Sequence, residues 1–310
     1  MPCLPKRIRL YTRAKALGEI VSLHFKLPEN WQSVVEGRIQ SLGFSLQSHD
    51  ALARAVLDLS NFFIRAQFQG DYWKEPKHRA AYLTYFSSLN YLRAASVFRE
   101  AKLLGFGAGA SRVVDWGCGA GSASLALILE LGLKISQITG IDKSTEALQE
   151  YQEILSVYGM EGQVATKKGV ELKFSDADFV IFSYSLNEVD TFPELPESAK
   201  WVAVIEPSTH QAGRRLLQWR DQMIEGDWFA WAPCTHQIPC PLFNRSGKDW
   251  CHHRINWDMP DWFSALETHL PMRNDTLTLS YLLLSKQAPP ANLTGLARVV
   301  GDEQKEAGKF

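Results

Sequence analysis

The stretch Val113-Val114-Asp115-Trp116-Gly117-Cys118-Gly119-Ala120-Gly121 decides the fold that this sequence predicts. Two valines and an acid are followed by three glycines at alternate positions, and an apolar helical pattern continues over 123–133. Glycine tolerates a positive φ and lets a ligand approach the backbone closely, while the amino end of a helix favours negative charge. We therefore expect a strand, a ligand-binding loop and a helix, which together form the first unit of an α/β fold.

The pattern downstream of this loop alternates between strands and helices. Apolar stretches predict strands at 135–141, near 164, at 178–183 and at 201–205, and helices are predicted over 145–158 and 213–224. Such alternation indicates a doubly wound parallel sheet. Residues 276–285 are expected to form a late strand that completes it. The sequence therefore predicts a Rossmann-like core.

The spacing D-x-G-x-G-x-G resembles the first motif of the class I S-adenosylmethionine-dependent methyltransferases. By this resemblance the core has the class I methyltransferase fold, Asp115 faces the methionine ammonium, and Asp142 binds the ribose hydroxyls. A carboxylate suits both tasks, because it accepts charge-assisted hydrogen bonds from an ammonium and bidentate ones from a diol. The residues to which cofactor binding is assigned are Asp115, Gly117, Cys118, Gly119, Gly121, Asp142 and Ser183.

Two other interpretations of the loop stay open. The dinucleotide fingerprint G-x-G-x-x-G would place Ser122 where its last glycine belongs, which disfavours a nicotinamide enzyme. A glycine-rich turn that binds no ligand is the second alternative. The coincidence of strand, loop, helix and second acid favours S-adenosylmethionine over both.

A polar loop follows the strand predicted at 178–183. Because ligands of open α/β sheets bind at the carboxyl ends of the strands, we expect Ser183, Asn187 and Glu188 to line the methyl-transfer cleft. Asn187 and Glu188 are the candidate catalytic residues, which would orient an acceptor in line with the sulfonium. For Glu188, capping of a following helix is an equal alternative.

Composition bounds the remaining possibilities. The 310 residues include 45% hydrophobic and 22% charged ones, as in a folded globular chain, and no apolar run is long enough to span a membrane. Residues 1–110 carry 15 Lys and Arg against 8 Asp and Glu, whereas residues 111–310 carry 18 against 26. We expect a helical, basic N-terminal region (1–105), a cofactor-binding core (106–225), a Cys/His/Trp insertion (226–275) and a last strand with a tail (276–310).

Three of the five cysteines lie close together in the sequence. Cys234, Cys240 and Cys251 have the spacing C-x5-C-x10-C, next to prolines and histidines. Thiolates suit zinc or an iron–sulfur cluster, and both favour four ligands. His236 or one of the pair His252-His253 could complete such a site, while three buried thiols in an aromatic core are the alternative.

These elements together resemble the small-ribosomal-subunit methyltransferase-like family of bacteria and mitochondria, which is tied to assembly of that subunit. The matching runs are 115–121, 183–188, 206–207, 233–242, 249–252 and 280–281. The resemblance implies a [4Fe–4S] cluster on Cys234, Cys240 and Cys251 and a fourth cysteine beyond Phe310. We accordingly expect the chain to be a shortened form, with another ligand as the alternative.

The expected function is that of an S-adenosylmethionine-dependent methyltransferase-like protein acting on the small ribosomal subunit or its rRNA. Lys6, Arg7 and Arg9 belong to a basic arm that would contact phosphates. The alternatives are a small-molecule methyltransferase with a zinc-stapled lid and a catalytically inactive RNA-binding assembly factor. We expect a monomer without membrane association, located in the bacterial cytoplasm or, in a eukaryote, in the mitochondrial matrix.

Overall fold

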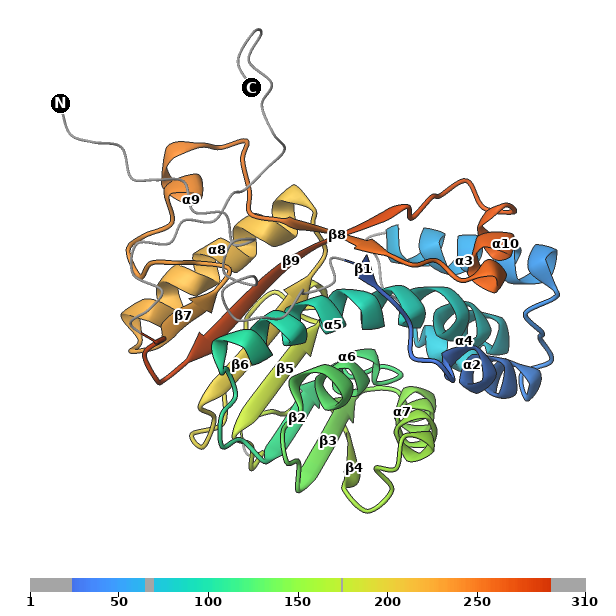
Figure 1. The fold of residues 1–310 in the computed structure, drawn as a ribbon, viewed down its shortest axis with the longest axis horizontal. Coiled ribbons are helices and arrows are strands. Elements are labelled where there is room, and N and C mark those ends of the chain that lie inside the picture. The colour runs from blue at the N-terminus through green and yellow to red at the C-terminus, as the bar shows by residue number, and fades with distance from the viewer. Residues whose placement is uncertain (1–23, 65–69, 174, 291–310) are drawn as a thin grey trace, which may run out of the picture.

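A mixed β-sheet forms the centre of the molecule (Figure 1). The computed structural model describes residues 24–64, 70–173 and 175–290. Five neighbouring strands of the sheet, β2 to β6, are parallel to one another. In spatial order they are β4 (Val164–Lys168), β3 (Gln137–Asp142), β2 (Arg112–Trp116), β5 (Phe179–Ser183) and β6 (Trp201–Glu206).

The long strand β9 (Thr276–Ser285) connects this parallel half to the rest of the sheet. It runs antiparallel to β6 on one side, and to both β7 (Phe229–Ala232) and β8 (His253–Trp257) on the other. The short β1 (His24–Phe25) then pairs in parallel with β8. The order β4-β3-β2-β5-β6 followed by a reversed strand is the class I methyltransferase topology, which confirms the predicted fold class. Residues 226–275 supply two strands of this sheet.

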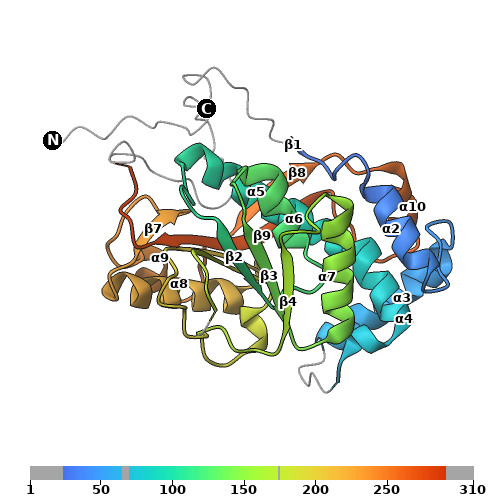
Figure 2. The same cartoon turned by 90° about the horizontal axis from the view of Figure 1, so that it is seen from below.

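Each face of the sheet has its own hydrophobic core. Along β5, Phe179 and Ile181 belong to one core, while Val180 and Phe182 belong to the other, because successive side chains of a strand point to opposite faces. The first core packs under α5 (Ser87–Leu104), α6 (Ser122–Ala126) and α7 (Thr145–Val157). The second packs under α8 (His210–Glu225), and Figure 2 shows α5 and α6 on one side of the sheet with α8 on the other.

The described part of the N-terminal region is helical, as predicted. It contains α2 (Trp31–Gln40), α3 (His49–Ile64) and α4 (Pro76–Ala81), which gather at one end of the sheet (Figure 1). Helix α4 continues through a π-helical turn, η2 (Tyr82–Phe86), into α5. It ends at Gly105, whose φ of 74° places it in the left-handed region that glycine tolerates.

The remaining helices differ from their predicted limits at the ends. The helix α6 continues as the π-helical η3 (Leu127–Leu131), and α8 begins three residues before its predicted start. That earlier start arises because the Thr209 side chain accepts a hydrogen bond from the Ala212 amide and caps the helix. Two short helices, α9 (Pro241–Arg245) and α10 (Asp261–Glu267), lie between the late strands.

Candidate functional site

A cavity of about 690 Å³ opens at the carboxyl ends of the parallel strands. The ends of β2, β3, β5 and β6 form its floor, and residues of the N-terminal helices form the opposite wall. This is the position at which open α/β sheets bind their ligands. Of the predicted site residues, those on its wall are Gly117, Gly119, Asp142, Ser183, Asn187 and Glu188.

Two glycines of the loop have a positive φ, and other parts of the protein also approach them closely. Gly117 has a φ of 69°, and a Cβ added to it would lie 2.5 Å from the Cβ of Ser185. Gly119 has a φ of 51°, and its added Cβ would lie 3.1 Å from the Tyr82 hydroxyl. The loop therefore packs against the β5 loop on one side and the N-terminal helices on the other. The approach at Gly117 leaves no room for a side chain, and a side chain at Gly119 would require the Tyr82 and Trp73 rings to shift.

Asp142 is the last residue of β3, and both oxygens of its carboxylate accept hydrogen bonds. Its Oδ2 accepts a hydrogen bond from the Gly119 amide at 3.0 Å, and its Oδ1 accepts one from the Ser144 amide at 2.9 Å. The side chain is 9% exposed and faces the cavity, and burial raises the pKa of the carboxyl. Each carboxylate oxygen has further acceptor capacity, so two neighbouring hydroxyls could bind here.

Asp115 lies behind the loop and is not among the residues that line the cavity. Its Oδ2 accepts a hydrogen bond from the Ser124 hydroxyl at 2.7 Å, whereas its Oδ1 is buried and finds no partner among the described residues. Burial raises the pKa of this carboxyl to about 7. The predicted contact with an ammonium therefore stays a prediction, and the observed contact is with the start of α6.

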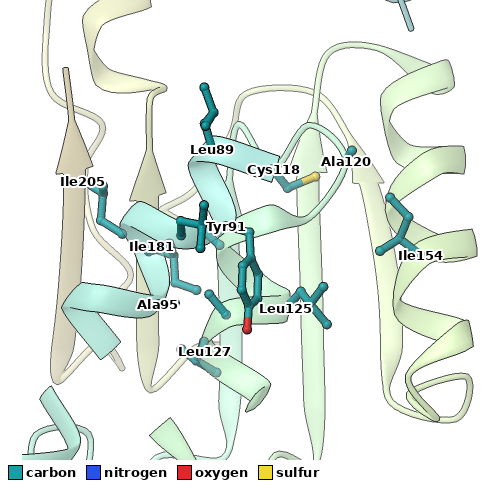
Figure 3. Close-up of a cluster of buried hydrophobic side chains, with 14 of the residues drawn as sticks. Leu89, Tyr91, Ala95, Cys118, Ala120, Leu125, Leu127, Ile154, Ile181 and Ile205 are labelled. Carbon is teal, nitrogen blue, oxygen red and sulfur yellow. The ribbon is translucent and has the colours of Figure 1, made fainter. Parts of the chain in front are cut away.

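Cys118 and Gly121 are likewise not among the residues that line the cavity. Cys118 belongs to the buried cluster that α5 covers, as Figure 3 shows together with Leu125 and Ile181. Gly121 lies against α7, because a Cβ added to it would come within 2.9 Å of the Tyr151 ring. These two positions shape the loop from behind.

The loop after β5 brings the predicted polar residues to the cavity. Tyr184 has a positive φ of 58°, unusual for a residue with a side chain, and η4 (Leu186–Glu188) follows. Glu188 Oε2 accepts a hydrogen bond from Lys143 Nζ at 3.2 Å, and burial raises the pKa of its carboxyl. Residues 189–200 contain no helix, so the alternative role of Glu188 as a helix cap has no helix to serve.

Glu206, at the end of β6, is a site residue that was not assigned a role from the sequence. It is 3% exposed, and its Oε1 accepts a hydrogen bond from the Leu186 amide at 3.0 Å. Its Oε2 is buried without a partner among the described residues, and burial raises the pKa of the carboxyl to about 8. The acid at a strand end was the available signal, since Asp115 and Asp142 follow the same pattern.

Three rings of the N-terminal region, Tyr72, Trp73 and Tyr82, form what we call the aromatic wall of the cavity. The centroids of the Trp73 and Tyr82 rings are 4.5 Å apart, and those of Tyr72 and Trp73 are 5.3 Å apart. A Cβ on Gly119 would lie 3.3 Å from the Trp73 ring. The sequence pattern did not predict this wall, because periodicity does not reveal which buried surface borders a cavity.

Of the predicted cysteine ligands, Cys234 packs against the second core. Cys234 follows β7, Cys240 precedes α9 and Cys251 precedes β8. The buried Arg220 holds this segment, donating from Nε to the Cys234 sulfur at 3.0 Å. Within the described ranges, no group of three or more His, Cys, Asp or Glu side chains is arranged to hold a metal ion. The three cysteines as placed here therefore do not form a cluster site, and its ligation stays a prediction from the sequence.

Fold and cavity together define a protein of the class I methyltransferase type. Comparison of the sequence with known families gives the more specific result. Residues 80–310 match the family described as mitochondrial small ribosomal subunit Rsm22, and the chain belongs to that family. This confirms the resemblance found in the motifs. The search of curated proteins found no match.

Solved structures similar to this chain include three methyltransferases. TrmK of M. capricolum in complex with S-adenosylhomocysteine is 11% identical, with 63% of this chain and 68% of that chain covered at a TM-score of 0.36. A methyltransferase from Thiobacillus denitrificans in complex with S-adenosylhomocysteine is 11% identical, with coverage of 62% and 90% and a TM-score of 0.35. The methyltransferase domain of bacterial CtHen1 is 15% identical, with coverage of 64% and 99% and a TM-score of 0.39.

No helix in the described part of the chain has the length and apolar character needed to cross a bilayer.

Proposed function

We propose that this protein binds S-adenosylmethionine in the cavity and acts as a methyltransferase-like factor on the small ribosomal subunit or its rRNA. The observation that carries the cofactor proposal is the Asp142 carboxylate, fixed by the Gly119 and Ser144 amides at the wall of the cavity. The subunit proposal is supported by the family, whose description names the mitochondrial small ribosomal subunit. A location in the mitochondrial matrix, or in a bacterial cytoplasm, follows from the same proposal.

The residues at the cavity fit a nucleoside with a positively charged substituent. Asp142 would accept hydrogen bonds from the ribose hydroxyls, and the backbone of Gly117 and Gly119 lines the same cavity. The unpartnered Oδ1 of Asp115 would be satisfied by a cation that reached it from the loop. When bound, S-adenosylmethionine supplies an electrophilic methyl group on a sulfonium.

The chain's own contribution to methyl transfer would be the orientation of the acceptor. Asn187 can donate and accept hydrogen bonds at the cavity wall, and Glu188 presents a carboxylate restrained by Lys143. Holding a nucleophile in line with a methyl donor lowers the entropic part of the barrier. The aromatic wall and the N-terminal helices line the same space from the other side.

Titration calorimetry with S-adenosylmethionine tests the cofactor site. We expect Asp142→Ala to reduce the affinity at least a hundredfold, because two hydrogen bonds to a charged group and the loop anchor are lost together. Asp249→Ala is the matched control, since that aspartate is exposed and does not line the cavity. An unchanged affinity in Asp142→Ala, with the fold intact, would refute the assignment.

Binding to purified small subunits and to their RNA over a range of salt concentrations tests the partner. Affinity that falls steeply with salt would support phosphate contacts. Absence of binding at low salt would leave the small-molecule methyltransferase as the better explanation. Methylation of the bound RNA, or its absence despite binding, would separate an enzyme from an assembly factor.

A metal at Cys234, Cys240 and Cys251 is a separate proposal that takes no part in the steps above. Its support is the cysteine spacing and the family, and an iron–sulfur cluster is preferred to zinc on that basis. Anaerobic purification followed by metal analysis tests it. Brown protein with stoichiometric iron would support a cluster, whereas colourless protein that contains zinc would overturn it.

A further inference from the structure

The aromatic wall borders the glycine loop of the proposed cofactor site. Gly119, at the centre of the loop, lies against both Trp73 and Tyr82, whose closest atoms are 3.3 and 3.1 Å from a Cβ built on it. All three rings of the wall also line the cavity. A ligand that occupies the cavity beside the loop therefore also meets aromatic carbon.

The wall is fixed in position before any ligand arrives. Asp71 accepts a hydrogen bond from the Trp73 amide at 3.1 Å and caps the single turn η1 (Tyr72–Lys74). Trp73 is 2% exposed, and the rings of Tyr72 and Tyr82 lie within 28° of parallel. Rings held in this way lose little conformational freedom when a ligand binds.

The electrostatic surroundings of the wall favour a cation. Burial raises the pKa of both Tyr72 and Tyr82, and the carboxylates of Asp142 and Glu188 add to that shift, so both phenols stay neutral. Neutral aromatic rings carry negative potential on their faces and attract cations, most strongly where water is excluded. The nearby carboxylates act in the same direction, whereas an uncharged aromatic ligand would gain nothing from them.

We infer that the aromatic wall of Tyr72, Trp73 and Tyr82 recognises the positive charge of the sulfonium and thereby distinguishes S-adenosylmethionine from its neutral product. The inference rests on the proposed function and adds three residues from outside the cofactor motif. Weaker binding of the neutral product than of S-adenosylmethionine would favour release of the product after methyl transfer. The wall would then set the affinity ratio of the two ligands, while Asp142 contributes equally to both.

Calorimetry of the full chain with S-adenosylmethionine and S-adenosylhomocysteine tests this inference. We expect Tyr82→Leu to weaken binding of the charged ligand about tenfold and to change that of the neutral ligand less than about twofold. Tyr82→Phe keeps the ring and should leave both affinities within about twofold of the original. Phe62→Leu is the matched control, because Phe62 packs against Tyr72 but does not line the cavity.

The remaining outcomes each have a definite meaning. Equal weakening of both ligands by Tyr82→Leu would indicate adenine stacking and overturn the inference. If Tyr82→Leu changed neither affinity, the wall would instead contact the methyl acceptor, and the inference would also be overturned. If Tyr82→Leu does not fold, Tyr72→Leu carries the same test, since Tyr72 is only partly buried. If the unmodified protein bound neither ligand, the proposed function itself would be refuted.

Discussion

Two carboxyls at strand ends, Asp115 and Glu206, are buried with one oxygen each that finds no partner among the described residues. Removal from water disfavours the charged form, and this dominates the raised pKa of both groups. Such groups make the unliganded protein less stable when ionised. Glu206 also lines the cavity, and a perturbed carboxyl in that position is a common mark of a functional site.

We predict that the unliganded protein loses stability as the pH rises from about 4 to 8. The unfolded chain ionises first, near the ordinary values of 3.8 and 4.5, whereas the folded carboxyls hold their protons up to about 7 for Asp115 and about 8 for Glu206. The stability present below the unfolded pKa values is therefore lost through those folded values. For Asp115 the loss is roughly 4 kcal/mol.

Urea denaturation at several pH values measures this effect. Asp115→Asn should flatten the curve up to about pH 7, and Glu206→Gln should flatten the part that extends to about pH 8. Identical pH dependence in the original protein and in both variants would show that neither carboxyl is buried in the way described.

Gly117 allows a second prediction at the scale of one residue. Gly117→Ala combines a left-handed φ with a clash against Ser185, whereas Gly43→Ala at a φ of 82° has nothing within 4 Å of its new Cβ. The control should cost about 1 kcal/mol from backbone strain alone. Gly117→Ala should cost clearly more and abolish S-adenosylmethionine binding. Equal thermal stabilities of the two variants would contradict the close approach.

At the scale of one element, Arg220 anchors the loop between β7 and α9. Its side chain is fully buried, and it donates to the Cys234 sulfur and to the carbonyl oxygens of His236 and Ile238, at 2.7 and 3.1 Å for the carbonyls. Asp221 pairs with the same guanidinium. Five donors in a fixed plane suit this task, which a lysine could not perform.

We predict that Arg220→Met destabilises the protein by about 3 kcal/mol, because it removes every hydrogen bond of a fully buried guanidinium and leaves the Asp221 carboxylate without its ion-pair partner. Arg220→Lys should restore little of this loss. Limited proteolysis should then cut within residues 234–240, while Gln218→Ala, at an exposed position of the same helix, should behave as the unmodified protein. An intact loop in Arg220→Met would mean that the cysteine segment is held by other contacts.

At the scale of the whole molecule, β9 joins regions that are distant in sequence. It pairs with β6, β7 and β8, so the strands that border the cavity and the cysteine segment share one sheet. The N-terminal region joins the same sheet through β1 and reaches the cavity through the aromatic wall. A ligand in the cavity would therefore contact both the core and the N-terminal region.

Partner binding belongs to the same scale. The basic arm, which includes Lys6, Arg7, Arg9, Arg13 and Lys15, lies outside the described residues, and its contact with phosphates is a prediction from charge. Changing these five residues to Gln in the full chain should weaken binding to small-subunit RNA and lower the salt slope by up to about 4. Calorimetry with S-adenosylmethionine should be unaffected. An unchanged slope would place the phosphate contacts elsewhere.

The sequence by itself determined the alternation of strands and helices, the glycine loop and the acid at Asp142, because these depend on local periodicity and on backbone angles that only glycine tolerates. The late strand over 276–285 was likewise predictable, with both ends correct. Membership of the family followed from ordered short motifs. All these signals reside in neighbouring residues.

Only the tertiary structure decided which of those residues face the cavity. In the folded protein Asp115, Cys118 and Gly121 contact the elements behind the loop, whereas Glu206 and the aromatic wall line the cavity. The direction of a side chain depends on the packing of elements that are far apart in sequence, and periodicity does not encode that packing. The loop was therefore predictable from the sequence, but the wall that faces it was not.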